Sequence, residues 1–384
     1  MLRAGVGYSF RQDSREAARE AAGLAVSRSG RPALTFLFTT VDYDQERVLE
    51  TVLEETGTAK LVGASGAGIV TREGIKRQGV QVLTLAGDGI VAETALLDIP
   101  SGQAAETGRA LAEKLLEGFP MKEGTVFLFP DGLSGNLARL LRGVYDLMGP
   151  GFQYAGGGTG DNLSFLKTFQ MTERGVASGA VAAALVGGCS FAAGIAHGWA
   201  PFGPPLLITR ARGKEVFEIN EQPAFQVYAR QLGGICPEDF PFHAARCPLG
   251  VPDATGRFII RDPVRLGAGG AMEFVTEVPC GAVAYLMRFR AVEELLGAAL
   301  EVVREACRLL PVPQFILLFN CVSRVLLMGE RADRELERVR EITGDVPVAG
   351  MLTFGEIGSF DGGVPLFHNK TFLCVVGGRK LHES

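Results

Sequence analysis

Polar side chains that could bind a ligand gather where apolar segments of this sequence stop. Glu356 lies in a tight glycine-containing bend between two apolar runs. A carboxylate there could accept hydrogen bonds from a ligand amine or from free backbone N–H groups of the bend itself. His368 and Asn369 follow in the same segment, just before the apolar run 372–376. This pattern predicts two buried strands joined by an exposed elbow, and it leaves both the ligand-binding and the structural interpretation of Glu356 open.

A second polar bend contains the glycine-rich sequence GGGTGDN at 156–162. Its glycines let a backbone approach a ligand closely, but they also permit positive φ in a sharp turn. The sequence is similar to the GGGTG loop of tubulin-like GTPases, yet it ends in an acidic residue, and a carboxylate aimed at phosphate is unfavourable. We therefore do not expect nucleotide binding. With the end of the apolar run 59–65 included, the candidate ligand contacts here are Ser65, Gly158, Thr159, Asp161 and Asn162.

Cys321 and Arg324 form the third candidate group, after the apolar run 314–320. A nearby guanidinium could lower the pKa of the Cys321 thiol and make it a nucleophile, whereas buried cysteines commonly serve packing alone. The planar fork of Arg324 suits a ligand carboxylate or phosphate, and it could equally pair with Glu356.

Metal and haem chemistry find weaker support. Four residues could supply zinc ligands, but their spacing is unlike the compact CxxC pairs of structural zinc sites. A haem ligand would have to come from His197 or His368, apart from a histidine in the tail, and no haem motif accompanies either. We expect no metal and no cofactor. The zinc candidates are Cys236, His243, Cys247 and Cys280.

The elements that carry these residues recur in a fixed order: helix, strand, polar loop, helix, strand, elbow and returning strand. The first helix is expected at 13–28, with Asp13 as its cap and Glu16 at the third helical position. The first two copies are offset by roughly ninety residues, too far for a solenoid, so we interpret them as duplicated subdomains. The runs 90–99 and 189–199 are expected to form hairpins with the strands that precede them. A third copy occupies the C-terminal part of the chain.

The predicted fold is therefore α/β, with duplicated β-α-β-type units that form mixed sheets flanked by helices. Between 205 and 290 the pattern alternates, which indicates a more antiparallel segment inserted in the C-terminal half. We divide the chain into two halves, 1–199 and 200–384. The hypothesis that follows is that the repeated elbows converge on one polar pocket.

Composition limits the function further. The chain has 384 residues, a net charge of −5, 47% hydrophobic and 21% charged residues, which describes a globular protein without a basic block for nucleic acid. Its 7 cysteines do not resemble a disulfide framework, and this favours the cytoplasm. The uncharged run 176–208 is split by glycines and predicts buried strands rather than a membrane span.

Several of these motifs resemble the FIST family, whose N-terminal and C-terminal domains would correspond to 1–199 and 200–384. The resemblance covers nearly the whole chain, although Ala64 replaces the usual cysteine of the first elbow. The matching segments are LVGASGAGIV at 61–70, YAGGGTGDN at 154–162, HGWAP at 197–201, FNCVSR at 319–324, TFGEIG at 353–358 and HNKT at 368–371.

The resemblance implies a sensory, signal-transducing protein that binds a small molecule, such as an amino acid or a similar small anion, without catalysis. Because the two halves fill the chain, we expect a separate output partner, such as a histidine kinase or a cyclic-dinucleotide enzyme. One alternative is a hydrolase or transferase that uses Cys321 or Glu356, and another is a scaffold. A third is a haem-based gas sensor, since some family members are proposed to bind haem. We expect no nucleic-acid or membrane partner.

Overall fold

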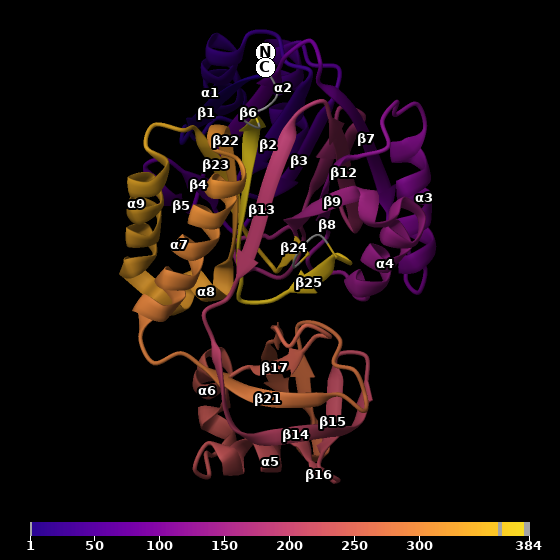
Figure 1. Ribbon diagram of the computed structural model, residues 1–384, viewed down its shortest axis with the longest axis vertical. Helices are drawn as coiled ribbons and strands as arrows, with labels where there is room; N and C mark the ends of the chain where they lie inside the picture. The colour runs from indigo at the N-terminus through magenta and orange to yellow at the C-terminus, as the bar shows by residue number, and fades with distance from the viewer. Residues whose placement is uncertain (1, 360–362, 380–384) are drawn as a thin grey trace.

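The computed structural model describes residues 2–359 and 363–379, which form three six-stranded sheets and a smaller domain with a sheet of its own. Figure 1 shows the three sheets side by side with helices on their outer faces and the smaller domain at one end. The predicted α/β class, with repeated units and mixed sheets, is confirmed. Among the described residues, no helix combines the length and the apolar character needed to cross a membrane.

Each sheet is built around one copy of the repeat, which we call modules 1, 2 and 3. Module 1 contains β1 (Arg3–Ser9), α1 (Ser14–Ser29), β2 (Leu34–Thr39), α2 (Gln45–Thr56), β3 (Leu61–Ser65), β4 (Ile69–Thr71), β5 (Gly74–Lys76) and β6 (Val80–Ala86). Module 2 contains β7 (Val91–Asp98), α3 (Ala104–Leu116), β8 (Gly124–Pro130), α4 (Leu137–Met148), β9 (Phe152–Gly157), β10 (Gln170–Thr172), β11 (Gly175–Ala177) and β12 (Ala180–Gly187). Module 3 contains β13 (Ser190–Ala196), α7 (Val292–Leu309), β22 (Val312–Cys321), α8 (Val322–Met328), α9 (Ala332–Thr343), β23 (Val348–Thr353), β24 (Glu356–Gly358), β25 (Leu366–His368) and β26 (Phe372–Arg379).

Two predicted hairpins are wrong. The strand β7 does not pair with β6, because β1 and β2 already occupy both edges of β6; β7 pairs with β12 instead. Likewise β13 pairs with β26 rather than with β12. Both strands open the next module instead of closing the previous one.

The modules exchange hairpins in a ring. The pair β4–β5 of module 1 joins the sheet of module 3, β10–β11 of module 2 joins module 1, and β24–β25 of module 3 joins module 2. Each hairpin extends the neighbouring sheet beyond its parallel strand pair. No module is therefore complete without its neighbour, and the three form one structural unit.

The inner faces of the three sheets share one core. Phe38, Phe129 and Phe319 occupy equivalent positions on β2, β8 and β22, and their ring centroids are 5.7 to 5.9 Å apart. All three side chains are fully buried. Aromatic pairs at this separation favour tilted and edge-to-face packing over a flat sandwich, as observed here. This cluster marks the pseudo-threefold axis.

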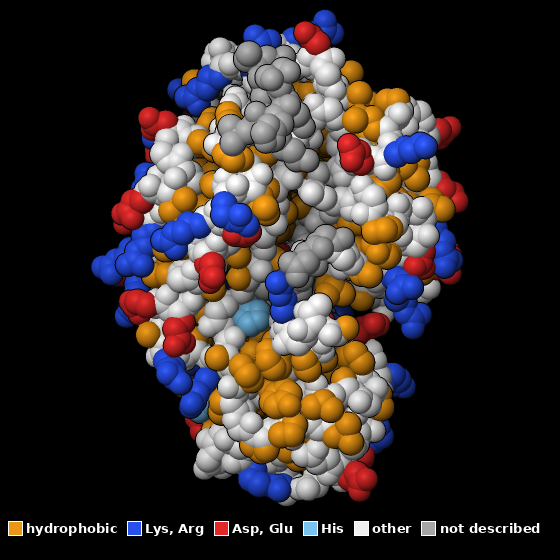
Figure 2. All heavy atoms as spheres, viewed as in Figure 1, with side chains coloured by type: hydrophobic (Ala, Val, Ile, Leu, Met, Phe, Trp, Pro, Cys, Tyr) orange, Lys and Arg blue, Asp and Glu red, His pale blue; other side chains and the backbone are white. Residues whose placement is uncertain are grey.

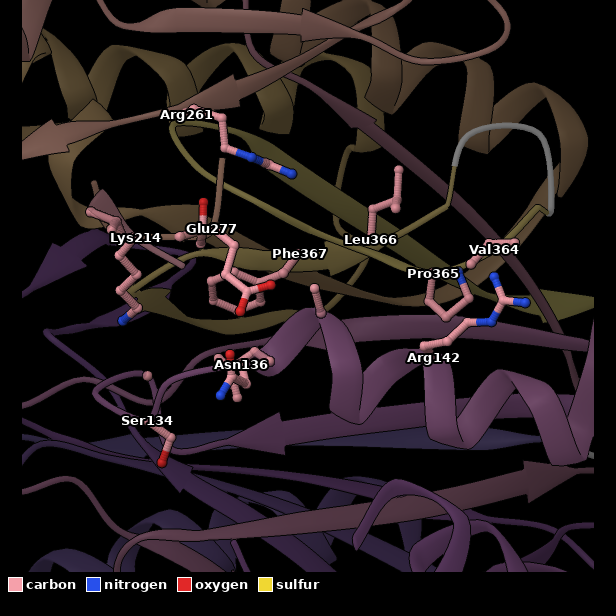
Figure 3. A pocket seen from close by; sticks show the side chains of 15 residues that line it. Ser134, Asn136, Arg142, Lys214, Arg261, Glu277, Val364, Pro365, Leu366 and Phe367 are labelled. Atoms are coloured by element: carbon pink, nitrogen blue, oxygen red, sulfur yellow. The ribbon is translucent and has the colours of Figure 1, made fainter. Parts of the chain in front are cut away.

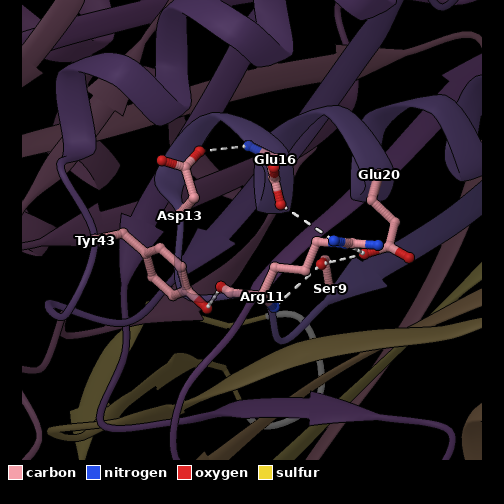
Figure 4. A network of polar contacts seen from close by, with 6 residues as sticks. All are labelled: Ser9, Arg11, Asp13, Glu16, Glu20 and Tyr43. Atoms are coloured by element: carbon pink, nitrogen blue, oxygen red, sulfur yellow. Dashed lines mark hydrogen bonds and ion pairs between the residues drawn. The ribbon is translucent and has the colours of Figure 1, made fainter.

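The start of α1 follows the prediction. The Asp13 carboxylate accepts a hydrogen bond of 2.9 Å from the Glu16 backbone N–H and so caps the helix (Figure 4). Arg11 forms ion pairs of 3.1 Å with Glu16 and with Glu20, and its carbonyl oxygen accepts a hydrogen bond from the Tyr43 hydroxyl. These contacts fix the segment between β1 and α1.

The smaller domain, which we call the insert, spans 200–288 between β13 and α7. It is mainly antiparallel, as predicted, and its β14 and β15 form a hairpin around Gly213. Its elements are β14 (Ala200–Arg212), β15 (Glu215–Ile219), β16 (Gln222–Pro223), α5 (Ala224–Gln231), α6 (Phe240–Arg246), β17 (Leu249–Pro252), β18 (Phe258–Arg261), β19 (Pro263–Leu266), β20 (Met272–Phe274) and β21 (Val283–Arg288).

Buried polar contacts join the insert to module 3. Lys370 Nζ lies 3.0 Å from Asp262 Oδ2, and both residues are almost fully buried. The Thr276 hydroxyl donates a hydrogen bond of 3.0 Å to the Asn369 side-chain oxygen. On the face in Figure 2, positive and negative side chains are interspersed, and hydrophobic side chains gather over the insert.

Candidate ligand site between the insert and module 2

A cavity of about 190 Å³ lies where the insert meets module 2. One wall comes from the start of α4 and the loop before it, a second from the insert, and a third from the segment 364–367. Figure 3 shows side chains from all three walls around it. Ligand sites commonly lie at such domain interfaces, so this is the candidate functional site.

Arg261 is the most unusual side chain of this wall. It ends β18, its Nη1 donates to the carbonyl oxygen of the adjacent Ile260 at 3.2 Å, and its Nε is buried without a hydrogen-bond partner in the described part of the chain. Burial lowers the pKa of Arg261 to about 10, and the Glu277 carboxylate opposes this only in part. A buried N–H group without a hydrogen-bond partner is costly, and a bound anion that accepts from it would remove that cost.

Lys214 and Glu277 line the same cavity from the turn after β14 and the segment after β20. Burial lowers the pKa of Lys214, and Glu273 and Glu277 oppose that effect. Glu273, however, is already paired with Arg265 at 2.8 Å. Glu277 is therefore the nearby carboxylate that Lys214 shares with Arg261.

The start of α4 faces the cavity from the opposite side. The helix forms because Leu137, Leu140 and Leu141 continue an apolar stripe that packs on the sheet of module 2, as the sequence predicts. Its first residue follows Asn136, which has a left-handed φ of 63° and provides no side-chain cap. The N-terminal N–H groups and the helix dipole together favour an anion at this end.

Three predicted ligand contacts of modules 1 and 2 are held by the protein itself. The Ser65 hydroxyl donates to the Gly160 carbonyl at 2.8 Å, and the Thr159 hydroxyl donates to Thr168 Oγ1 at 2.7 Å. The Asp161 carboxylate accepts three backbone N–H groups of the following turn, at 2.6 to 3.0 Å. These bonds give Asp161 a structural role within its own turn.

The other two have different surroundings. The Asn162 amide donates to Asp42 Oδ2 at 2.9 Å near the surface. A Cβ at Gly158 would lie 3.1 Å from Gly132 Cα and 3.2 Å from the Phe367 ring. Both of those neighbours line the cavity, so Gly158 lies directly behind its wall.

The three elbows do converge, but through their backbones. Each elbow donates one N–H to a carbonyl oxygen of the next module, and all three bonds are 2.9 Å long. The side chains between them are buried rather than arranged around an open pocket. The bonds run from Ala67 to Leu352, from Gly160 to Ser65 and from Phe354 to Gly158.

Arg324 is fully buried and pairs with Glu335 of α9, not with Glu356. Its Nη2 lies 2.7 Å from Glu335 Oε1, and its Nη1 donates to Asn320 Oδ1 at 3.2 Å. The sequence could not identify this partner, because Glu335 lies on a different helix. The guanidinium that lines the cavity from the insert is that of Arg261.

Glu356 lies in a buried polar cluster of module 3. The hydroxyls of Thr353 and Thr371 donate to its carboxylate, as does the Thr371 backbone N–H at 3.1 Å. Burial nevertheless raises the pKa of Glu356 to about 8. Burial, with the Glu356 charge, raises the pKa of the Cys321 thiol to about 12, which is the opposite of what a thiolate nucleophile requires.

His368 and Asn369 complete this cluster, and both are buried. Burial lowers the pKa of His368 to about 3, so its imidazole is neutral at pH 7, and its Nε2 lies 3.3 Å from the Gly358 carbonyl oxygen. Asn369 contacts Thr276, which itself lines the cavity. The ten predicted residues thus lie behind the cavity wall or away from it, and their role in ligand binding stays a prediction.

A second hollow, a groove of about 870 Å³, runs along β13 and α7 and reaches His197. Both ring nitrogens of His197 are engaged, because Nδ1 accepts from the Trp199 N–H at 2.9 Å and Nε2 lies 3.1 Å from the Phe258 carbonyl oxygen. A haem iron would have to displace one of these bonds. Nor are the predicted zinc ligands gathered: no cluster of three or more His, Cys, Asp or Glu suited to a metal occurs in 2–359 and 363–379.

Sequence reasoning missed the cavity residues Lys214, Arg261 and Glu277, although it had placed the insert. The available signal was a charged residue, Arg261, at the end of the apolar run 258–260. The sequence alone does not show that the helix α4 lies opposite that strand end.

Comparison with known proteins gives the following relationships. The family model of the FIST N domain matches residues 33–222, and that of the FIST C domain matches residues 224–359. An uncharacterised protein of Mycobacterium bovis is 28% identical over 94% of this chain and 95% of its own length. An uncharacterised protein of Mycobacterium tuberculosis is 27% identical over 94% and 96%.

Among solved structures, a cyanuric acid hydrolase from A. caulinodans aligns over 99% of this chain and 100% of its own. The identity is 10% and the TM-score is 0.37, too low to support a conclusion about fold or activity.

Proposed function

Since the chain belongs to the FIST family, whose domains are associated with small-ligand sensing in signalling proteins, we propose that it is a non-catalytic sensor of a small anionic molecule. The ligand would bind in the cavity between the insert and module 2. An amino acid or a similar small anion is the class that the family resemblance implies. The bound state would be passed to a separate cytoplasmic partner, for which a histidine kinase or a cyclic-dinucleotide enzyme is the proposed type.

The buried, unpartnered Nε of Arg261 is the observation that carries this proposal. A fold gains nothing from a buried N–H group that lacks a hydrogen-bond partner, because the described residues do not offset the cost of burying it. A ligand anion offsets that cost with charge-assisted hydrogen bonds. Function-related groups are often destabilising in the unliganded protein in this way.

The alternative of hydrolysis or transfer finds less support in the site. Cys321 is buried with a raised thiol pKa, and Glu356 already accepts three hydrogen bonds from protein donors. Neither residue lines the Arg261 cavity. A general base or nucleophile must reach its substrate within hydrogen-bonding distance, so both would first require the elbow to open.

Thermal unfolding of the full chain with a panel of amino acids, dicarboxylates and inorganic phosphate tests the proposal. A ligand present at about a hundred times its Kd should stabilise the folded state by about 2.7 kcal/mol. We expect Arg261→Met to abolish the response, because methionine keeps the apolar stem and removes the charge.

Arg210→Met is the matched control. Arg210 also belongs to the insert, but it is exposed and already pairs with Glu218 at 2.9 Å. This variant should respond to the ligand as the unmodified chain does. Full stabilisation of the Arg261→Met protein, or no stabilisation of the unmodified chain by any compound, would refute the proposal.

A further inference from the structure

We infer that the cavity takes a small dianion whose two negative groups are separated, as in a short dicarboxylate, rather than a zwitterion or a single phosphate group. The inference rests on the proposed function and specifies the ligand of the same site. It follows from the charge, the arrangement and the size of the cavity.

The charge of the lining favours a dianion. The described lining residues include three cations, Arg142, Lys214 and Arg261, and one carboxylate, Glu277, which leaves an excess of two positive charges. The uncapped start of α4 adds a partial positive charge. Arg142 reaches the cavity from the second turn of α4, although its Nε also pairs with Asp146 at 2.6 Å. A ligand with one negative charge would leave part of this excess uncompensated.

The positive groups come from two parts of the chain: Arg261 and Lys214 belong to the insert, and Arg142 with the start of α4 belongs to module 2. Figure 3 shows Arg261 on one side of the cavity and Ser134 and Asn136, next to the start of α4, on the other. Glu277 and the Phe367 ring lie between them in this view. A compact anion such as phosphate would engage one of the two parts, whereas a ligand with two separated carboxylates would engage both.

A zwitterion is less well matched. Its ammonium group would need an acceptor, and the carboxylate that lines the cavity is that of Glu277, which also lies near Lys214 and Arg261. Each of those cations would repel a ligand ammonium in a site of low dielectric constant. Among the described lining residues, the second carboxylate of a dicarboxylate is repelled by Glu277 alone, whereas Arg261 and Lys214 both attract it.

The volume limits the ligand to a small molecule. A cavity of about 150 Å³ holds benzene, so 190 Å³ suits a ligand of roughly six to ten non-hydrogen atoms. Succinate lies in this range, while nucleotides and haem are far larger. The cavity is therefore too small for the ligands of the nucleotide and haem hypotheses.

Isothermal titration calorimetry of the full chain with succinate, butyrate and γ-aminobutyrate tests the inference, because the three share one chain length and differ in charge. Inorganic phosphate serves as the compact dianion. Losing one charge-assisted contact should weaken binding about 10-fold to 100-fold, so succinate should bind more tightly than the other three by that factor. In Arg261→Met, succinate should bind no better than butyrate does to the unmodified chain, and Arg210→Met should leave succinate binding unchanged.

The outcomes separate the two levels of the proposal. If butyrate or γ-aminobutyrate binds as tightly as succinate and Arg261→Met abolishes that binding, the inference of a dianionic ligand is refuted, while the proposed ligand site at Arg261 is supported. If phosphate binds most tightly, the separation of the two groups is wrong. If none of the four compounds binds, the inference of a dianionic ligand is refuted. If, in addition, no compound of the thermal-unfolding panel stabilises the protein, the proposed function is refuted as well.

Discussion

Replacing Arg261 with methionine should stabilise the unliganded protein. Burial lowers the pKa of Arg261 from its ordinary value to about 10, and at about 1.36 kcal/mol per pKa unit the charged form is about 3 kcal/mol less favourable in the fold than in water. Part of the side chain reaches solvent, so screening reduces this cost to about 1–2 kcal/mol. Methionine loses the part-buried Nη1 bond to Ile260, worth about 1 kcal/mol. The net gain is between zero and about 1 kcal/mol.

Differential scanning calorimetry at pH 7 without added ligand measures this effect. A gain of about 1 kcal/mol raises the Tm by about 2–4 °C in a domain of moderate size. Because the folded pKa of Arg261 lies below the unfolded one, the cost of the charge is present at every pH below about 10 and disappears only as the pH rises toward the unfolded pKa. The difference between variant and unmodified chain should therefore be constant from pH 6 to 9.

The exposed Arg210→Met serves again as the control, and its effect should stay within about 0.5 kcal/mol. A loss of stability of more than about 1 kcal/mol in Arg261→Met would refute the reasoning, since it would mean that the guanidinium is satisfied within the fold.

Three further outcomes follow from the buried polar groups and the glycines. Arg324→Leu should lower the free energy of unfolding in urea by about 3–5 kcal/mol, because it leaves Glu335 buried without its cation. The double variant with Glu335→Leu should recover most of this loss, and an equal loss in the single and double variants would contradict the reasoning. Glu356→Gln should raise the Tm more at pH 8 than at pH 5. Burial raises the pKa of this carboxyl to about 8, so the folded state binds its proton more tightly than the unfolded state and loses stability as the pH rises. A Tm difference between variant and unmodified chain that does not change with pH would contradict this. Gly156→Ala should destabilise the protein more than Gly63→Ala. The added Cβ would lie 2.0 Å from a carbonyl oxygen of the neighbouring strand at position 156 and 2.8 Å from one at position 63. Equal unfolding midpoints of the two variants would show that the strands move apart.

The repeat could be predicted from the sequence because each copy carries its own local signals. Apolar runs mark the buried strands, glycines mark the elbows, and Asp13 marks the start of α1 through a cap that depends on residues close in sequence. The same signals located the elbows correctly, and these do converge. They could not show that the convergence is made by backbone hydrogen bonds that leave the polar side chains buried.

Long-range pairing is where sequence reasoning failed. From the sequence, β7 is predicted to be the hairpin partner of β6 because the two are adjacent in the chain. The local sequence does not show that β1 and β2 occupy both edges of β6. The partners of Arg324 and Arg261 pose the same problem. Arg324 pairs with a carboxylate on a separate helix, whereas Arg261 forms no ion pair among the described residues and has Glu277 only as a more distant neighbour. The local sequence around each arginine does not distinguish the two cases.

Comparing equivalent positions of the three modules shows which side chains the fold requires. The strand registers place Ile69 of module 1 and Gln170 of module 2 at the hairpin position that Glu356 occupies in module 3. The module therefore forms with an apolar, an amide or an acidic residue there, and the carboxylate is not a requirement of the fold. The polar cluster of module 3 lies beside the contacts to the insert, including the buried pair Lys370–Asp262. The threefold arrangement thus builds the scaffold, and the chemistry that distinguishes one module from another lies where the insert breaks that symmetry, next to the cavity around Arg261.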